Sequence, residues 1–235
     1  MGYRKTPIVN GEFYHIYNRG NGRQQIFFDD RDYYRFIQLI FLCNSTRQVN
    51  FREDIVEKKI EAWDFDRGET IVSIGAWVLM PNHFHIYVTS PKDRLLGEEN
   101  NITVFMRKLG TAYSKYINTK YDRTGSLFEG RFKSVHICDD VQAKYLFSYI
   151  HLNPVKLFHK SWKEEGIKDK EAAIEFLDNY KWSSYQDYLG EDRVEYKILE
   201  RKSFPDYFPT KKVFQEEIFD WINLSQKTVF GEFEK

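Results

Sequence analysis

The segment at residues 71–89 constrains the fold more than any other part of this 235-residue chain. Residues 71–80 read IVSIGAWVLM and residues 83–89 read HFHIYVT, and only Pro81 and Asn82 separate the two runs. Two short runs of β-branched, aromatic and aliphatic residues joined by a two-residue turn are typical of a β-hairpin. The first run is apolar almost throughout, which predicts a buried strand.

Other segments extend this hairpin into an ordered series of elements. Residues 12–18 and 132–137 have strand composition, whereas residues 29–44, 101–121 and 139–152 carry apolar side chains at helical spacing. Asp139 and Asp140 supply an N-cap for the last helix, which ends at Asn153 and Pro154. The order β-α-β-β-α-β-α predicts an α+β protein with a ferredoxin-like split βαβ core, that is, an antiparallel sheet with helices on one face.

The chain divides into a core and an extension. We expect residues 1–155 to form the core, and residues 156–235 a helical, aromatic-rich extension packed on it. Residues 47–70 contain 12 charged side chains and are expected to be a solvated insertion with a short helix around residues 54–63.

Composition excludes several classes of protein. Hydrophobic residues make up 42% of the chain, so a substantial core forms, and the net charge of zero argues against a surface coated with basic charge for duplex binding. Cys43 and Cys138 form no paired spacing, which predicts no disulfide framework and a reducing compartment. The start lacks a secretory pattern and no run reaches 18 apolar residues, so we expect a soluble, cytoplasmic protein.

His83 and His85 are the first residues capable of chemistry. Residues two apart on a strand point to the same face, so the two imidazoles can converge on one divalent cation. Phe84, between them, is expected to face the helices, which leaves both histidines on the open face of the sheet. The competing interpretation is one core histidine beside one surface histidine, because a His-x-His strand alone is a weak signal.

Tyr149 and Asn153 are the second pair. Four residues apart on a helix, they share one face about one turn apart. The Asn oxygen can act as a third metal ligand, and a tyrosine hydroxyl can act as a covalent nucleophile on a nearby phosphate. By itself the pattern does not single out Tyr149 among 16 tyrosines, since Tyr145 lies on the same face.

A basic, aromatic stretch runs from Phe105 to Lys133. It contains seven basic and two acidic residues interleaved with tyrosines and phenylalanines. Cations for phosphates together with aromatic rings for bases are typical of a surface that binds single-stranded nucleic acid, although a solvated helix face has similar composition.

Together these strings resemble those of the single-tyrosine HUH transposases of bacterial insertion sequences, in particular the REP-associated tyrosine transposase branch. The similar strings are YHIYNRGNGRQQIF (residues 14–27), WVLMPNHFHIYV (77–88), TGSLFEGRFKS (124–134), YIHLNPV (149–155) and WSSYQDYLG (182–190). They follow the family's order and span about three quarters of the chain. PNHFH together with YIHLNPV is the most specific combination.

The resemblance implies a role for each residue. His83 and His85 are expected to bind Mg²⁺ or Mn²⁺, with Asn153 as a third ligand. Tyr149 is expected to attack a phosphodiester of single-stranded or hairpin DNA, giving a 5′-phosphotyrosine enzyme and a free 3′-hydroxyl. Residues 1–155 would then be the HUH transposase catalytic core. The residues expected to contact DNA are Arg19, Arg23, Lys108, Arg131 and Lys133.

Two alternatives remain open at the level of sequence. One is a metal-dependent phosphoesterase that uses water, and the other is a catalytically idle module that binds single-stranded nucleic acid. The chain is expected to work as a monomer or a homodimer. The connection at residues 137–141 is short, which favours a Tyr149 that acts beside the histidines of its own subunit.

Overall fold

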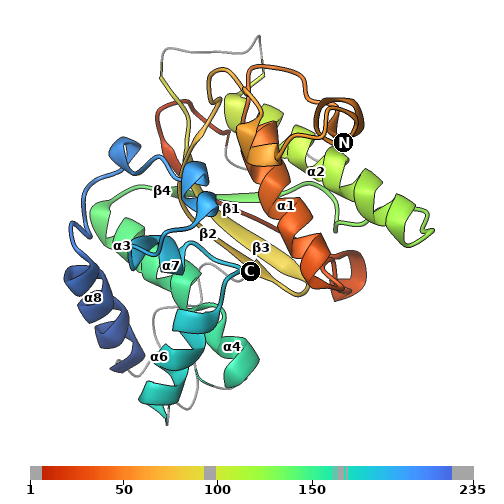
Figure 1. Ribbon diagram of the computed structural model, residues 1–235. Helices are drawn as coiled ribbons and strands as arrows, with labels where there is room; N and C mark the ends of the chain where they lie inside the picture. The colour runs from red at the N-terminus through yellow and green to blue at the C-terminus, as the bar shows by residue number, and fades with distance from the viewer. Residues whose placement is uncertain (1–6, 93–98, 161, 163–166, 168, 224–235) are drawn as a thin grey trace.

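The computed structural model describes residues 7–92, 99–160, 162, 167 and 169–223 (Figure 1). Its centre is a four-stranded sheet in the order β2-β3-β1-β4. All three neighbouring pairs are antiparallel. The strands are β1 (Phe13–Arg19), β2 (Ser73–Met80), β3 (His83–Thr89) and β4 (Lys133–Ile137). This strand order, with one helix in each of the two crossovers, is the ferredoxin-like arrangement, and it confirms the predicted α+β fold class.

Two helices cover one face of the sheet. These are α1 (Asp30–Cys43) and α2 (Asn101–Lys120), which pack against each other and lie together on one side of the strands in Figure 1. Asp29 begins α1 through a reciprocal capping box with Asp32, a pairing that satisfies backbone amides at a helix start. From β3, Phe84 points to this layer and contacts Phe36 of α1.

The opposite face of the sheet is also covered, which corrects the expectation of an open face. Helix α3 (Asp140–Leu152) packs across β2 and β3 on this side (Figure 1). Eight of its 13 residues carry buried apolar or aromatic side chains or histidine, so the helix is apolar nearly all round and needs a cover on its outer side too. The molecule is therefore layered helix–sheet–helix, and β3 is buried from both sides.

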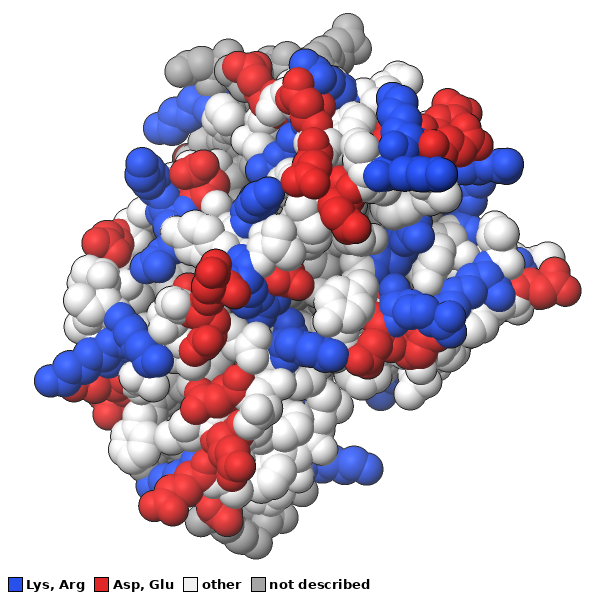
Figure 2. Space-filling view, in the orientation of Figure 1, with Lys and Arg blue, Asp and Glu red and all other residues white. Residues whose placement is uncertain are grey.

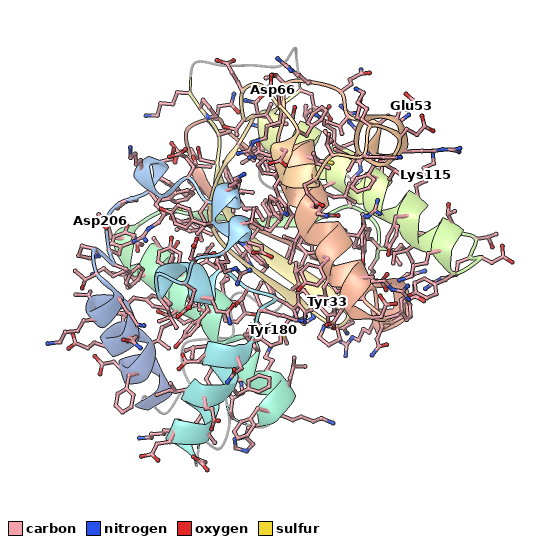
Figure 3. The ribbon with its side chains drawn as sticks, viewed as in Figure 1. Tyr33, Glu53, Asp66, Lys115, Tyr180 and Asp206 are labelled. Atoms are coloured by element: carbon pink, nitrogen blue, oxygen red, sulfur yellow. The ribbon has the colours of Figure 1, made fainter. Side chains whose placement is uncertain are left out.

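The chain after α3 supplies that outer cover. Its helical elements are α4 (Val155–Phe158), α6 (Lys170–Asn179), α7 (Tyr185–Tyr188), η4 (Val194–Ile198), η5 (Arg201–Ser203) and α8 (Lys211–Asn223). Before α7, the backbone at Trp182 and Ser184 hydrogen-bonds to Leu79 and Trp77 at the edge of β2. This stretch shields the exposed edge that β2 would otherwise present. In Figure 3, Tyr180 lies close to Tyr33 of α1, and its hydroxyl donates to the carbonyl of Leu79.

The insertion at residues 47–70 differs from the expected short helix. It contains a π-helical turn, η2 (Phe51–Glu57), and a 3₁₀ turn, η3 (Ala62–Asp64). Two of its apolar side chains, Ile55 and Ala62, are buried, and the ring of Trp63 lies 5.1 Å from that of Phe41 in α1. The apolar residues are too few and too irregularly spaced for an amphipathic helix, so short turns anchor the insertion. Its charged residues, such as Glu53 and Asp66, lie at the periphery (Figure 3).

In the part of the chain that the structure describes, none of the helices is both long enough and apolar enough to cross a lipid bilayer.

Candidate active site

Strand β3 presents the two predicted histidines to the α3 side of the sheet. Phe84 and Ile86 face α1 and α2, so the strand's alternation turns His83 and His85 the other way. Their ring centroids lie 5.0 Å apart with the planes at 86°. His83 is half-buried, and its Nδ1 lies 2.6 Å from the Oδ1 of Asn82 in the hairpin turn. His85 is buried beneath α3.

Helix α3 places Tyr149 directly against this pair. The Tyr149 ring lies 5.3 Å from the ring of His85 and meets it edge-on at 84°. Asp139 fixes where the helix begins, because its carboxylate accepts from the amide of Gln142. Tyr149 is only 2% exposed. The histidine pair and the tyrosine therefore come together within one chain, although α2, β4 and most of α3 separate them in sequence.

A third histidine, His15 of β1, belongs to the same cluster and was missed by the sequence reasoning. Its Nε2 lies 2.8 Å from the Nδ1 of His85, and its ring stands 6.0 Å from that of Tyr149. Burial lowers the pKa of His15 to about 3, so its imidazole is neutral at neutral pH. The available signal was the alternation in β1, where His15 faces away from its apolar neighbours Tyr14 and Ile16, but only the pairing of β1 with β3 brings it to His85.

Asn153 lies at the end of α3, one turn beyond Tyr149. Its side chain is 1% exposed, and neither its Oδ1 nor its Nδ2 has a hydrogen-bond partner among the described residues. A buried amide without partners costs about 1–3 kcal/mol. Such a group is explained when it serves a ligand, so this observation fits a metal or phosphate contact at Asn153.

Lys156 is a second residue that the sequence reasoning passed over. It lies on α4, seven residues after Tyr149, and its Nζ is 6.0 Å from the centre of the Tyr149 ring. Positions seven apart in a helical stretch share a face, which was the available signal. A cation beside a phenol favours the phenolate and attracts a phosphate.

The five residues predicted to contact DNA are spread over several elements. Lys133, on β4, has its Nζ 6.0 Å from the ring of Tyr17, which stacks on His15, so it borders the histidine cluster. Arg19 forms an ion pair with Glu129, and Arg23 is exposed in the turn η1 (Asn21–Arg23). Arg131 lies on the α2 side of the sheet.

The fifth residue, Lys108, is engaged with the protein itself. Its Nζ donates to the backbone carbonyls of Ser45 and Arg47 at distances of 2.7 and 3.1 Å. Lys108 thus ties α2 to the start of the insertion, and its contact with DNA stays a prediction.

His151 has a structural role within the string YIHLNPV. Its Nδ1 donates to the Phe147 carbonyl, and its Nε2 lies 2.8 Å from the Ser184 hydroxyl. Burial lowers the pKa of His151 to about 3, so the ring is neutral. His151 thus joins α3 to the segment WSSYQDYLG. This contact gives His151 and Ser184 a structural reason to be present that needs no role in catalysis.

Comparison with known proteins finds a similar fold but no family that matches at the level of sequence. No family model matches the chain, and neither does any curated protein. A solved structure does match: a REP-associated tyrosine transposase bound to a REP hairpin, with a TM-score of 0.51. Sequence identity is 15%, and the alignment covers 83% of this chain and 90% of that one. The chain therefore shares its fold with a REP-associated tyrosine transposase over most of both lengths.

Proposed function

We propose that this protein is a metal-dependent transposase or endonuclease of the REP-associated tyrosine type, which cleaves and rejoins single-stranded DNA at hairpin-forming repeats through a 5′-phosphotyrosine. The observation that carries the proposal is the contact of the Tyr149 ring with His85, a residue of the predicted histidine pair. The shared fold with a transposase that was solved on a REP hairpin supports a DNA partner.

The donor set fits a divalent cation. Two imidazoles and one amide oxygen would come from His83, His85 and Asn153. Because the Nδ1 of His85 is engaged with His15, its metal-binding atom would be Nε2. Among the described residues, no group of three His, Cys, Asp or Glu side chains is placed so that it could hold a metal ion, so the Asn oxygen is what would complete the set. Mixed nitrogen and neutral oxygen ligands suit Mn²⁺ better than Mg²⁺, which prefers oxygen alone.

Each residue of the site would have its own role in strand cleavage. A bound cation would supply Lewis acidity toward the scissile phosphate. The Tyr149 oxygen would attack phosphorus as the bond to the 3′ oxygen breaks, the phenol proton would leave, and the departing strand would end as a 3′-hydroxyl. Lys156 would favour the phenolate. A different 3′-hydroxyl could reverse the step, because the tyrosyl ester keeps the energy of the broken phosphodiester.

The burial of Tyr149 sets a condition on this chemistry. Only 2% of the residue is exposed, so a phosphate reaches the phenol only when α3 or the chain that covers it shifts. No second subunit is needed to bring the tyrosine to the histidines, because both lie together in a single chain. This supports attack within one subunit.

The first test is a covalent trapping experiment. The protein is incubated with Mn²⁺ and 5′- or 3′-labelled single-stranded hairpin oligonucleotides, and the adduct is mapped by mass spectrometry. Wild type should form a phosphotyrosine at Tyr149, Tyr149→Phe should form none, and EDTA should suppress the reaction. Tyr145→Phe is the matched control, since Tyr145 is a buried tyrosine on the same helix with its ring 6.3 Å from that of Tyr149.

Two results would favour the alternatives. Cleavage that persists in Tyr149→Phe would point to a phosphoesterase that uses water. Binding of hairpins by wild type without any cleavage, unchanged in His83→Ala, would point to an idle binding module.

A further inference from the structure

A cysteine, a histidine and a glutamate form a linear chain of contacts where β4 ends. The Sγ of Cys138 lies 3.3 Å from the Nδ1 of His136, and the Nε2 of His136 lies 3.0 Å from the Oε2 of Glu12. His136 pairs across the sheet with Tyr14, which points away from the side to which its neighbour His15 turns. The chain of contacts is therefore on the opposite face of the sheet from the histidine cluster and outside the candidate active site.

The sheet holds the histidine of this chain in a fixed position. The ring of His136 packs on that of the buried Tyr14, with the centroids 5.2 Å apart and the planes at 34°. The Tyr14 hydroxyl accepts a hydrogen bond from the amide of Val9. The carbonyl of Glu12 accepts one from the hydroxyl of Thr89 in β3. Both the imidazole and the residue that carries its carboxylate partner are thus anchored to the paired strands.

The glutamate determines which nitrogen of His136 carries the proton. An ionised carboxylate only accepts hydrogen bonds, so the Nε2 of the ring donates to Glu12. In the neutral imidazole this leaves Nδ1, on the side of Cys138, as an acceptor. The thiol hydrogen can therefore pass to the ring. A nucleophile, a base and a group that orients the base are arranged in this way where a side chain is activated for attack.

A structural contact at the edge of the sheet accounts for Glu12 and His136 but not for Cys138. Cysteine is among the residue types most often buried in proteins, as Cys43 is in this chain. Cys138 is exposed, and a base lies beside its sulfur. An exposed thiol with an aligned base has the surroundings of a reactive cysteine.

The surroundings of the sulfur select among the reactions of a thiolate. Acyl transfer needs backbone amides directed at an oxyanion, and the amide of Cys138 already donates to the side chain of Gln142, 3.1 Å away. Metal binding is not served either. Both ring nitrogens of His136 are engaged, and no three His, Cys, Asp or Glu side chains in the described ranges could hold a cation. Exchange with a disulfide needs only access to the sulfur.

The charge around Cys138 is mixed. Asp139, Asp140 and Lys144, at the start of α3, are all exposed. Acidic and basic side chains are likewise interspersed over the face shown in Figure 2. Such a surface neither attracts nor repels small molecules of one charge strongly. The chemistry of the sulfur, rather than charge, therefore determines the class of reactant.

We propose that Cys138 is a thiol-modification site that forms a mixed disulfide with a low-molecular-weight disulfide, with His136 as its base and Glu12 orienting that base. His136 takes the thiol proton, and the sulfur attacks one sulfur of the disulfide. A new S–S bond forms as the old one breaks, and the departing thiolate takes the proton from the imidazolium. Cys138 is oxidised and half of the small disulfide is reduced to its thiol, so the reaction needs no other reactant. The inference is independent of the proposed function.

The rate of reaction with the chromogenic disulfide dithionitrobenzoate tests the role of the histidine. Reduced, folded protein should show one fast-reacting thiol, which Cys138→Ser removes, because Cys43 is buried. His136→Phe keeps a ring on Tyr14 but has no base. Since an isolated thiol is only a few per cent ionised at pH 7, we expect this variant to react about ten-fold more slowly than wild type at that pH.

The dependence of the rate on pH separates assistance by a base from a change in packing. Below about pH 8 the rate for His136→Phe should fall about ten-fold per pH unit, as for any unassisted thiol, and the wild-type rate should fall less steeply. Glu12→Ala keeps the ring but releases it, so it should give an intermediate loss, and it decides the question if His136→Phe does not fold. Asp140→Asn, the matched control, removes a nearby negative charge outside the chain of contacts and should not lower the rate.

The product is mapped by mass spectrometry after incubation with glutathione disulfide. The mixed disulfide should lie on Cys138, and a reducing agent should restore the free thiol. Equal rates for wild type, His136→Phe and Glu12→Ala at every pH would show an ordinary exposed thiol and overturn the inference. An adduct on Cys43 alone, or no adduct, would overturn it too. None of these results bears on adduct formation at Tyr149, so the proposed function would stand.

Discussion

At the scale of a single residue, the side chain of Asp187 lies where burial disfavours its charged form. It is buried, and neither oxygen has a hydrogen-bond partner among the described residues. Burial raises its pKa to about 7, against the opposing effect of Arg193, whose Nε lies 3.4 Å away. Between pH 3.8 and about 7 the folded protein therefore holds a proton that the unfolded chain has lost. The free energy of unfolding should fall as pH rises through this window.

Asp187→Asn should remove that pH dependence. The neutral amide has no charge to bury, so we expect the variant to be more stable than wild type by about 1–3 kcal/mol at pH 8 and equally stable near pH 4. Urea unfolding at the two pH values measures the difference. Asp192→Asn, an exposed carboxyl five residues away, is the control and should change little. A stability gap that is the same at both pH values would show that Asp187 is not the titrating group.

At the scale of elements, one cluster joins the start of α1 to the end of α2. The Nζ of Lys120 lies 2.9 Å from Asp29 and 2.6 Å from Asp32, and two tyrosine hydroxyls also donate to Asp32. The hydrogen bond from Lys120 lowers the pKa of Asp29 to about 2. Burial would raise the pKa of Asp32, but the hydrogen bonds it accepts, first that from Lys120, lower it overall. Their stabilisation is thus present above the ordinary carboxyl pKa and is lost as pH falls toward 2.

Lys120→Met should cost about 2–4 kcal/mol at pH 7, because it leaves the fully buried carboxylate of Asp32 without its cation. Asp29 is partly exposed and screened by solvent, so it adds little to this figure. The deficit should shrink as pH falls from about 4 toward 2, because the unfolded chain, and then the native carboxylates, take up protons in this range. Thermal or urea unfolding between pH 3 and 7 measures it. Lys115→Met, on the solvent side of the same helix (Figure 3), should be neutral; a deficit independent of pH would contradict the account.

The elements also show what the sequence can and cannot predict. Local signals sufficed where they acted within one element: the alternation in β3 separated Phe84 from the histidines, and Asp139 marked the start of α3. Contacts between distant segments could not be predicted from local patterns. The pairing of β1 with β3 brings His15 to His85, and the packing of α3 closes the face that was expected to be open. The turns of the insertion form around the scattered Ile55 and Trp63, which have no regular period.

At the scale of the whole molecule, α3 is held between the sheet and the C-terminal elements. Phe214 of α8 is fully buried, and its ring lies 6.0 Å from Phe147 and 5.3 Å from His151, both on α3. It also lies within 5.3 Å of the rings of Tyr185 and Tyr188 in α7. The outer layer thus fixes the far side of the helix whose inner side carries Tyr149.

Phe214→Ala should therefore loosen α3 before it loosens the rest of the fold. Removing a buried ring costs about 3–5 kcal/mol, and the loss should appear as faster amide hydrogen exchange in α3 and α7, while α1 and α2 keep their protection. Val213→Ala, at the exposed neighbour, is the control. In the proposed function, the buried Tyr149 becomes accessible only when its cover shifts. That cover packs on the side of α3 that faces away from the histidines. Equal loss of protection in every helix would show instead that the sheet, its two helices and the outer layer open as one unit.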